Sequence, residues 1–445
     1  MPPATLSPAA EKAIVRKVFW RIIPFCFLLF VISYIDRSNI SYAALQMNKE
    51  LGLSAEAFGF AAGVFFVGYF LFEVPSNLAM ARFGARTWLA RILITWGIVA
   101  TLSAFVQNAT QLYVLRFLLG VTEAGFFPGV VMYLTGWFRA KEYATTVAYF
   151  TAAIPASFLL GAPISTFIMD HLSGHGLSGW RWMLLLEGAP AILGGIAAYF
   201  LLIDRPAQAP WLSAEERAWL EGEIARDQGA VKGVRHLNTW KTLTDGKVLY
   251  LSLVFFLYQC GSFGINYWLP QILKSLSKSY SISDVGLITM VPYALATVAM
   301  VGWSIHSDWK RERQWHSALP LLVGGVALGA VSLVTNPAIA ITLFSIAIMA
   351  LYAFRSPFWA LPSLFLTRST AAISIAVINS VGNIGGFVGP FIFGALKDRT
   401  GNAAAGMMFL SGMVVIAAFM TWIMRLHPSG DPPAEAALRT ADAAS

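Results

Sequence analysis

The chain has 445 residues, of which 57% are hydrophobic and 12% are charged, and its mean hydropathy is +0.64. Soluble domains carry about 25% charged residues, so this composition excludes a water-soluble fold of such length. The formal net charge of +8 is compatible with nucleic-acid binding, but the positions of the basic residues indicate membrane topology instead, and no nucleic-acid partner is expected.

Apolar stretches recur along the chain with the length of about 20 residues that crosses a hydrocarbon core. Backbone groups in lipid must bond within their own segment, so these stretches predict α-helices. We therefore expect an all-α membrane protein. The predicted spans are 18–46, 56–80, 87–106, 110–136, 143–169, 182–203, 247–273, 284–306, 316–335, 338–366, 371–396 and 403–425.

One long polar connection divides the twelve spans into two sets of six. The predicted domains are an N-terminal six-helix bundle, a linker with a short amphipathic helix, a C-terminal six-helix bundle and a cytoplasmic tail, at 1–203, 204–246, 247–426 and 427–445. The two halves show weak sequence similarity, since GAPISTFIMDHLSG at 161–174 resembles GPFIFGALKDRTG at 389–401. Such duplication predicts two pseudo-symmetric bundles, an arrangement typical of transporters.

The linker contains its own helix signal. Ser213 and Glu216 have the spacing of a capping box, and Trp219, Leu220 and Ile224 would share one helix face. This helix either rests on the inner membrane surface or belongs to a solvated linker.

The distribution of basic residues predicts the orientation. With both termini in the cytoplasm, most of the 31 Lys and Arg residues fall on the cytoplasmic side, as the positive-inside rule requires. The basic residues left on the outer side are Lys49, Arg181, Lys274, Lys278, Lys397 and Arg399. We expect a multi-pass protein of the cell's inner membrane.

A charge inside a span is costly and marks a candidate site. In the fourth span, Arg116 and Glu123 are seven residues apart, so they share a helix face about 10.5 Å apart along the axis. The first span contains Asp36 and Arg37 in a long apolar run. The alternative is that these charges pair with other helices and only hold the bundle together.

Other candidates are weaker on their own. Tyr69 lies among aromatic residues of the second span and either supplies a hydroxyl or packs in the core. Arg355, beside Ser356, either binds a carboxylate with its rigid guanidinium or extends toward an interface. Asn379 belongs to a polar stripe among glycines of the eleventh span.

Catalytic and metal chemistry find no support in the sequence. The six histidines lie in loops or at span ends, Cys26 and Cys260 lie in apolar runs, and no phosphate-binding Gly-Lys loop or nucleophile–base arrangement is visible. We expect neither an enzyme nor a bound metal or cofactor.

At this point the sequence resembles the anion:cation symporter branch of the major facilitator superfamily. The resemblance covers nearly the whole chain and rests mainly on YIDRSNIS from Tyr34, EVPSNLAMARFGARTWLARI from Glu73, RFLLGVTEAGFFPGVVMYLTGWF from Arg116 and NSVGNIGGFVGP from Asn379. Members of that branch include proton-coupled carriers of tartrate, sugar acids and aromatic acids.

The resemblance implies roles for the matching residues. Arg37 would contact the anionic substrate, Asp36 and Glu123 would take part in proton coupling, and Arg116 would tune them. Tyr69, Ser356 and Asn379 match positions that line the pocket in sugar-acid carriers.

Two positions depart from the pattern. The loop signature after the second span usually has an acid, but the stretch that contains Arg82 and Arg86 has none, whereas the related loop after the eighth span keeps Asp308. These three residues are the predicted gating-loop set. Arg355 is not expected in sugar-acid carriers, and it favours a dicarboxylate such as tartrate.

The sequence thus predicts a secondary transporter that works as a monomer and moves a small organic anion with protons by alternating access. An anion exchanger or a channel-like anion pathway would use the same arginines. An anion-binding membrane sensor is the alternative of another class.

Overall fold

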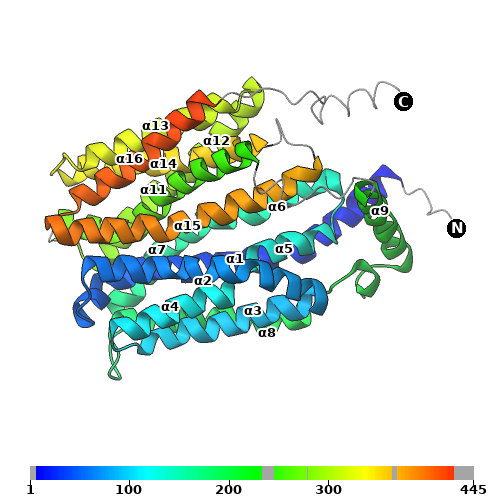
Figure 1. Ribbon diagram of the computed structural model, residues 1–445. Helices are drawn as coiled ribbons and strands as arrows, with labels where there is room; N and C mark the ends of the chain where they lie inside the picture. Colours follow the sequence, from blue (N-terminus) through cyan, green and yellow to red (C-terminus); the bar gives the residue numbers. More distant parts are fainter. Residues whose placement is uncertain (1–6, 233–244, 278, 363–367, 425–445) are drawn as a thin grey trace. The chain divides into compact units, whose positions relative to one another are not determined.

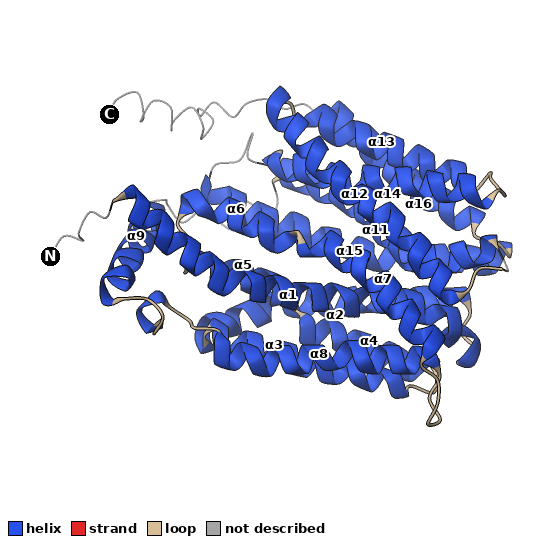
Figure 2. Cartoon of the chain, turned by 180° about the vertical axis from the view of Figure 1, so that it is seen from behind, coloured by secondary structure: helices blue, strands red, loops and turns tan. Residues whose placement is uncertain are grey.

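The computed structural model describes residues 7–232, 245–277, 279–362 and 368–424. Within these ranges, all twelve predicted spans are present as helices long and apolar enough to cross a membrane (Figure 1). No strand occurs in the described parts (Figure 2), so the predicted all-α class is confirmed. The first helix begins at Pro8 rather than near residue 18, because a polar helical segment precedes the apolar run.

The helices form two compact units, Met1–Ala43 with Val67–Val234, and Ala44–Phe66 with Arg235–Ser445. The division passes through the first two helices, α1 (Pro8–Glu50) and α2 (Ala55–Phe83). Unit 1 also contains α3 (Ala85–Leu102), η1 (Ser103–Phe105), α4 (Ala109–Glu123), α5 (Phe126–Thr135), α6 (Ala140–Thr151), α7 (Ala153–His171), α8 (Gly179–Leu201), η2 (Pro206–Gln208) and α9 (Ala214–Lys232). Unit 2 contains α11 (Gly246–Leu276), α12 (Ile282–Lys310), α13 (Gln314–Val331), α14 (Pro337–Ala360), α15 (Arg368–Thr400) and α16 (Ala404–Ile423). The predicted domain limits remain a prediction.

Glycines allow the helices of unit 1 to approach closely. A Cβ atom at Gly97 of α3 would lie 2.7 Å from the backbone nitrogen of Ile192 in α8, and one at Gly195 of α8 would lie 2.9 Å from the Ala90 carbonyl oxygen. Small residues at such contacts let backbones pack together in lipid, where association depends on van der Waals packing. The α3–α8 pair therefore forms a rigid side of unit 1.

Unit 2 uses the same device between the first half of α2 and α15. A Cβ atom at Gly63 would lie 2.8 Å from the backbone oxygen of Phe387. The carboxylate of Asp398 in α15 accepts hydrogen bonds from the backbone N–H groups of Ala55 and Glu56, at 3.0 and 2.7 Å. It thereby satisfies two of the donors that a helix start leaves open, which fixes the beginning of α2.

The linker helix α9 packs on unit 1 beside the start of α1 (Figure 1). Its predicted capping box is confirmed, because Ser213 and Glu216 exchange hydrogen bonds of 2.8 and 3.1 Å. Trp219, Leu220 and Ile224 are all buried. The predicted apolar face therefore lies against the protein itself, and the position of the helix at the membrane surface or in a solvated linker stays a prediction.

Arg139, between α5 and α6, anchors this helix. Its guanidinium pairs with Glu11 of α1 at 3.0 Å, Glu142 of α6 at 2.6 Å and Glu223 of α9 at 3.4 Å, and it lies 4.8 Å from the ring centre of Trp219. Burial opposes its charge, but the hydrogen bonds to Glu142 and Glu11 raise the pKa of Arg139 above its ordinary value. One arginine therefore holds three helices together by charge.

Candidate functional site

An ion pair between α1 and α4 lies in the interior of unit 1. The guanidinium of Arg37 donates to Oε1 of Glu123, and the Ser33 hydroxyl donates to the same oxygen at 2.8 Å. The Glu123 side chain is fully buried, and that of Arg37 is 12% exposed. The second carboxyl oxygen of Glu123, Oε2, is buried without a hydrogen bond to any described residue. Only one of the two carboxyl oxygens of Glu123 therefore accepts hydrogen bonds from described residues.

Two tyrosines flank the Arg37 guanidinium. Its central carbon lies 4.9 Å from the ring centre of Tyr34 and 5.3 Å from that of Tyr69 in α2. A cation over an aromatic face is attracted by the negative face of the ring's quadrupole. The predicted residues Arg37, Tyr69 and Glu123 therefore lie together, and aromatic surfaces border the cationic group.

Asp36 occupies the neighbouring position on α1. Its side chain is 1% exposed, and Oδ2 accepts a hydrogen bond from the indole N–H of Trp96 in α3 at 2.7 Å. It interacts electrostatically with Glu123 and with Arg116, which is also buried. The four charged residues predicted from the first and fourth spans therefore share one buried region of unit 1.

Sequence reasoning missed a third buried carboxyl group in this region. Glu187 of α8 accepts a hydrogen bond of 2.6 Å from the Ser165 hydroxyl of α7, and it interacts electrostatically with Asp36. The signal was present, since Glu187 is the only charged residue between Arg181 and Asp204. The cost of a charge inside a span applies to it as it does to Asp36.

The fourth span is broken directly after Glu123. The sequence predicts one span over 110–136, but α4 ends at Glu123 and α5 begins at Phe126. The break lies at Gly125, whose φ of +86° is left-handed, a conformation that glycine adopts without steric cost. Pro128 falls in the first turn of α5, where its missing N–H is harmless. Irregular backbone beside buried charge is typical of transport sites.

Gly125→Ala tests this break. We expect it to lower the free energy of unfolding by about 1–3 kcal/mol, because φ is positive and the new Cβ would lie 2.5 Å from Oγ of Ser76. Ser76 is held in place, since its hydroxyl accepts a hydrogen bond of 3.0 Å from the Trp88 indole. The measurement is the thermal unfolding midpoint in detergent. The control is Gly412→Ala in α16, where a Cβ meets nothing within 4 Å; equal midpoints for the two variants would contradict the prediction.

The predicted residues of the second half lie in unit 2. Arg355 and Ser356 are adjacent on α14, and Asn379 is on α15. Arg355 and Asn379 are half-buried, whereas Ser356 is exposed and shares a hydrogen bond of 2.7 Å with Ser304 of α12. We call Asp36, Arg37, Tyr69, Arg116 and Glu123 the Arg37 cluster. The association of Arg355, Ser356 and Asn379 with this cluster remains a prediction.

The predicted gating-loop residues are engaged near helix ends. The backbone N–H of Arg86 donates to Oδ1 of Asp204 at 2.9 Å, and its guanidinium lies 4.6 Å from the ring centre of Tyr199. Asp204 thus brings to this loop of unit 1 a carboxylate that the loop lacks. The Arg82 guanidinium lies 5.6 Å from the ring centre of Phe83. In unit 2, Asp308 pairs with Arg313 at 2.6 Å.

Comparisons with known proteins identify the family. Residues 26–390 match the Major Facilitator Superfamily. A protein named "Putative tartrate transporter" from Agrobacterium vitis is 47% identical, over 93% of this chain and 95% of its own length. A "Quinolone resistance transporter" from Acinetobacter baumannii is 36% identical, over 93% and 95%.

A solved structure confirms the fold. An inward-open structure of the xylose transporter XylE from E. coli aligns with a TM-score of 0.76 at 15% identity, covering 94% of this chain and 99% of its own. At that identity the likeness concerns the fold alone. Together with the twelve apolar helices, these matches show that the chain belongs to the Major Facilitator Superfamily and is a multi-pass membrane transporter of a small molecule, not an enzyme.

Proposed function

We propose that the protein carries a small organic anion together with protons. The substrate class is a carboxylate such as tartrate or another hydroxy or sugar acid. The names of its relatives from Agrobacterium vitis support this class, and so does a buried arginine bordered by tyrosines in unit 1. The distribution of Lys and Arg supports a position in the inner membrane with both termini in the cytoplasm.

The Arg37–Glu123 ion pair is the observation that carries this proposal. A guanidinium binds a carboxylate through paired N–H donors, and in the described structure Glu123 occupies that position. A substrate carboxylate that approaches Arg37 competes with Glu123 for the same donors. If Glu123 left Arg37 while still charged, it would be a buried carboxylate without a partner, which is strongly unfavourable.

Protonation of Glu123 removes this conflict. A neutral carboxyl group no longer needs Arg37, which becomes free to bind the substrate. Because binding free energies are reciprocal, a proton on Glu123 favours the anion to the same extent that the anion favours the proton. Proton and anion then move together as the two halves of the fold alternate access to the site.

The remaining charged residues support the same exchange. Asp36 is held by Trp96 and gives a second carboxyl group that can take a proton. Arg116 interacts electrostatically with Asp36, so the exchange of a proton at Asp36 would depend on the separation of the two groups. Arg355 would bind a second carboxylate of the substrate. The substrate's hydroxyl groups would form hydrogen bonds with the side chains of Tyr69, Ser356 and Asn379.

Proteoliposomes that contain a pH-sensitive dye test the proposal. Adding tartrate outside, without an imposed pH gradient, should acidify the lumen, because each anion enters with protons. Threitol, which has the same hydroxyl groups and no carboxylates, should cause no change, and neither should tartrate added to protein-free liposomes. Uptake that requires a preloaded carboxylate and leaves the internal pH constant would identify an exchanger and overturn symport.

A further inference from the structure

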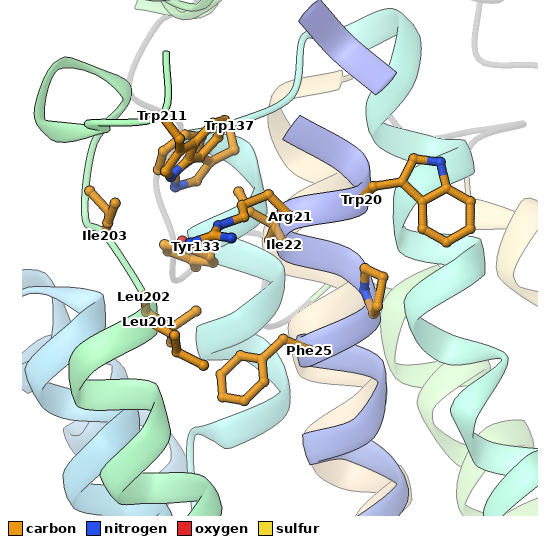
Figure 3. A pocket seen from close by; sticks show the side chains of 11 residues that line it. Trp20, Arg21, Ile22, Phe25, Tyr133, Trp137, Leu201, Leu202, Ile203 and Trp211 are labelled. Atoms are coloured by element: carbon orange, nitrogen blue, oxygen red, sulfur yellow. The ribbon is translucent and has the colours of Figure 1, made fainter. Parts of the chain in front are cut away.

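A cavity lies at the end of unit 1 that carries α9. It has a volume of about 200 Å³ and is bounded by α1 from Trp20 to Phe25, the end of α5 and the end of α8 with the chain after it (Figure 3). None of its lining residues belongs to the Arg37 cluster. It is therefore a separate binding space in the transporter.

The polar groups of the cavity gather at one end. Arg21, Tyr133, Trp137 and Trp211 lie together there, and Phe25 and Leu201 form the apolar part (Figure 3). The Trp137 and Trp211 rings stack with their centres 5.6 Å apart. The cavity thus combines a cationic end with an apolar wall.

Two hydrogen-bond donors of this end are unused. Arg21 is exposed and makes no hydrogen bond or ion pair with any residue that the structure describes. Trp137 is 1% exposed, and its indole N–H is buried without a hydrogen-bond partner among those residues. Asp204, which follows the lining residue Ile203, already accepts a hydrogen bond from the backbone N–H of Arg86. A buried donor without an acceptor is costly, and a bound ligand that supplies an acceptor removes the cost.

We infer that this cavity binds the phosphate headgroup of an anionic phospholipid. Arg21 would pair with the phosphate, and the Trp137 N–H would donate to one of its oxygens. The lipid's acyl chains would follow the exposed apolar side chain of the lining residue Leu201, which is 54% exposed. Basic pockets at the cytoplasmic side of membrane helices are suited to anionic headgroups.

Charge selects among lipids. Stacked indoles can attract a quaternary ammonium group, but the Arg21 cation in the same cavity repels it. The α1 helix also carries Lys12, Arg16 and Lys17 before Arg21, and of these Lys17 is paired with Glu216 of α9. These features favour a headgroup without a cation, such as that of phosphatidylglycerol, over phosphatidylcholine.

The test uses the full chain in detergent and measures thermal unfolding with each lipid at equal concentration. Phosphatidylglycerol should raise the unfolding midpoint of the wild type more than phosphatidylcholine with the same acyl chains. In Arg21→Gln, and in Trp137→Phe, which keeps a ring but removes the donor, the apparent affinity for phosphatidylglycerol should fall at least fivefold. Arg16→Gln, an exposed arginine on the same helix that does not line the cavity, should keep the wild-type affinity.

Three other results would contradict the proposal. Equal effects of the two lipids on the wild type would show only apolar association. Equal loss in Arg16→Gln and Arg21→Gln would show attraction by bulk charge. Inorganic phosphate or glycerol 3-phosphate that stabilises as well as the lipid, against sodium chloride of equal ionic strength, would make this a site for a free anion. The lipid comparison needs no variant, so it remains decisive if a substitution prevents folding.

Discussion

Glu123→Gln should abolish proton-driven accumulation of the carboxylate while leaving exchange of one carboxylate for another measurable. Glutamine keeps the size and hydrogen-bonding capacity of the side chain but cannot exchange a proton in the transport cycle. A difference of one pH unit is worth about 1.4 kcal/mol per proton and supports about tenfold accumulation in one-to-one symport. In the variant, the ratio of internal to external carboxylate should stay at about one under the same gradient.

The matched control is Ser33→Ala. It removes the hydroxyl that donates to Oε1 of Glu123 at 2.8 Å but leaves the titratable group and its ion pair with Arg37. Its accumulation ratio should remain close to that of the wild type. Undiminished accumulation by Glu123→Gln would remove Glu123 from coupling, and equal loss in both variants would mean that packing around the carboxyl group, rather than its proton, limits transport.

The twelve spans could be predicted because their physical cause is local. A run of apolar side chains must form a helix in lipid, and no distant residue is needed to decide it. The start of α9 was equally local, as the capping box of Ser213 with Glu216 shows. The start of α2 combines a local cap, in which the Ser54 hydroxyl accepts from the Ala57 N–H at 3.1 Å, with Asp398, which is far away in the sequence; no local pattern reveals the second contact.

The break in the fourth span shows the limit of local reasoning. Both Gly125 and Pro128 can distort a helix, and proline is usually the stronger breaker. The choice of Gly125 depends on its tight approach to Ser76 of α2, a tertiary contact. The fifth span is interrupted at Ala152, between α6 and α7, where φ stays negative. There Pro155 lies four residues after Thr151, the last residue of α6, and lacks the N–H that would bond the Thr151 carbonyl.

The candidate site was predicted where the residues carry formal charge in a span. That rule found Asp36, Arg37, Arg116 and Glu123, which share a buried region in the structure. It would also have found Glu187 had it been applied to every acid. The rule gives no partners, however, and the specific pairing of Arg37 with Glu123 rather than with Asp36 is a property of helix packing.

Arg37→Met should eliminate carboxylate binding and also destabilise the protein. Methionine is a flexible apolar side chain that fills the space but leaves Glu123 as a buried charge without its cation, at a cost of about 3–5 kcal/mol. We expect a lower unfolding midpoint in detergent. Loss of the guanidinium should weaken carboxylate binding at least a hundredfold, or about 2.8 kcal/mol, measured as loss of the ligand-induced rise in the midpoint.

The double variant Arg37→Met/Glu123→Gln separates the two roles of Arg37. Replacing both partners leaves no buried charge at this pair, so the unfolding midpoint should recover most of what Arg37→Met loses, since a buried ion pair can be replaced by neutral groups at little cost. Carboxylate binding should not recover, because nothing in the pair then attracts an anion. Arg91→Met, which removes a half-buried arginine lying 4.0 Å from the Trp88 ring centre in the same unit, should keep binding. A double variant that binds the carboxylate as the wild type does would show that Arg37 holds the helices together and takes no part in substrate recognition.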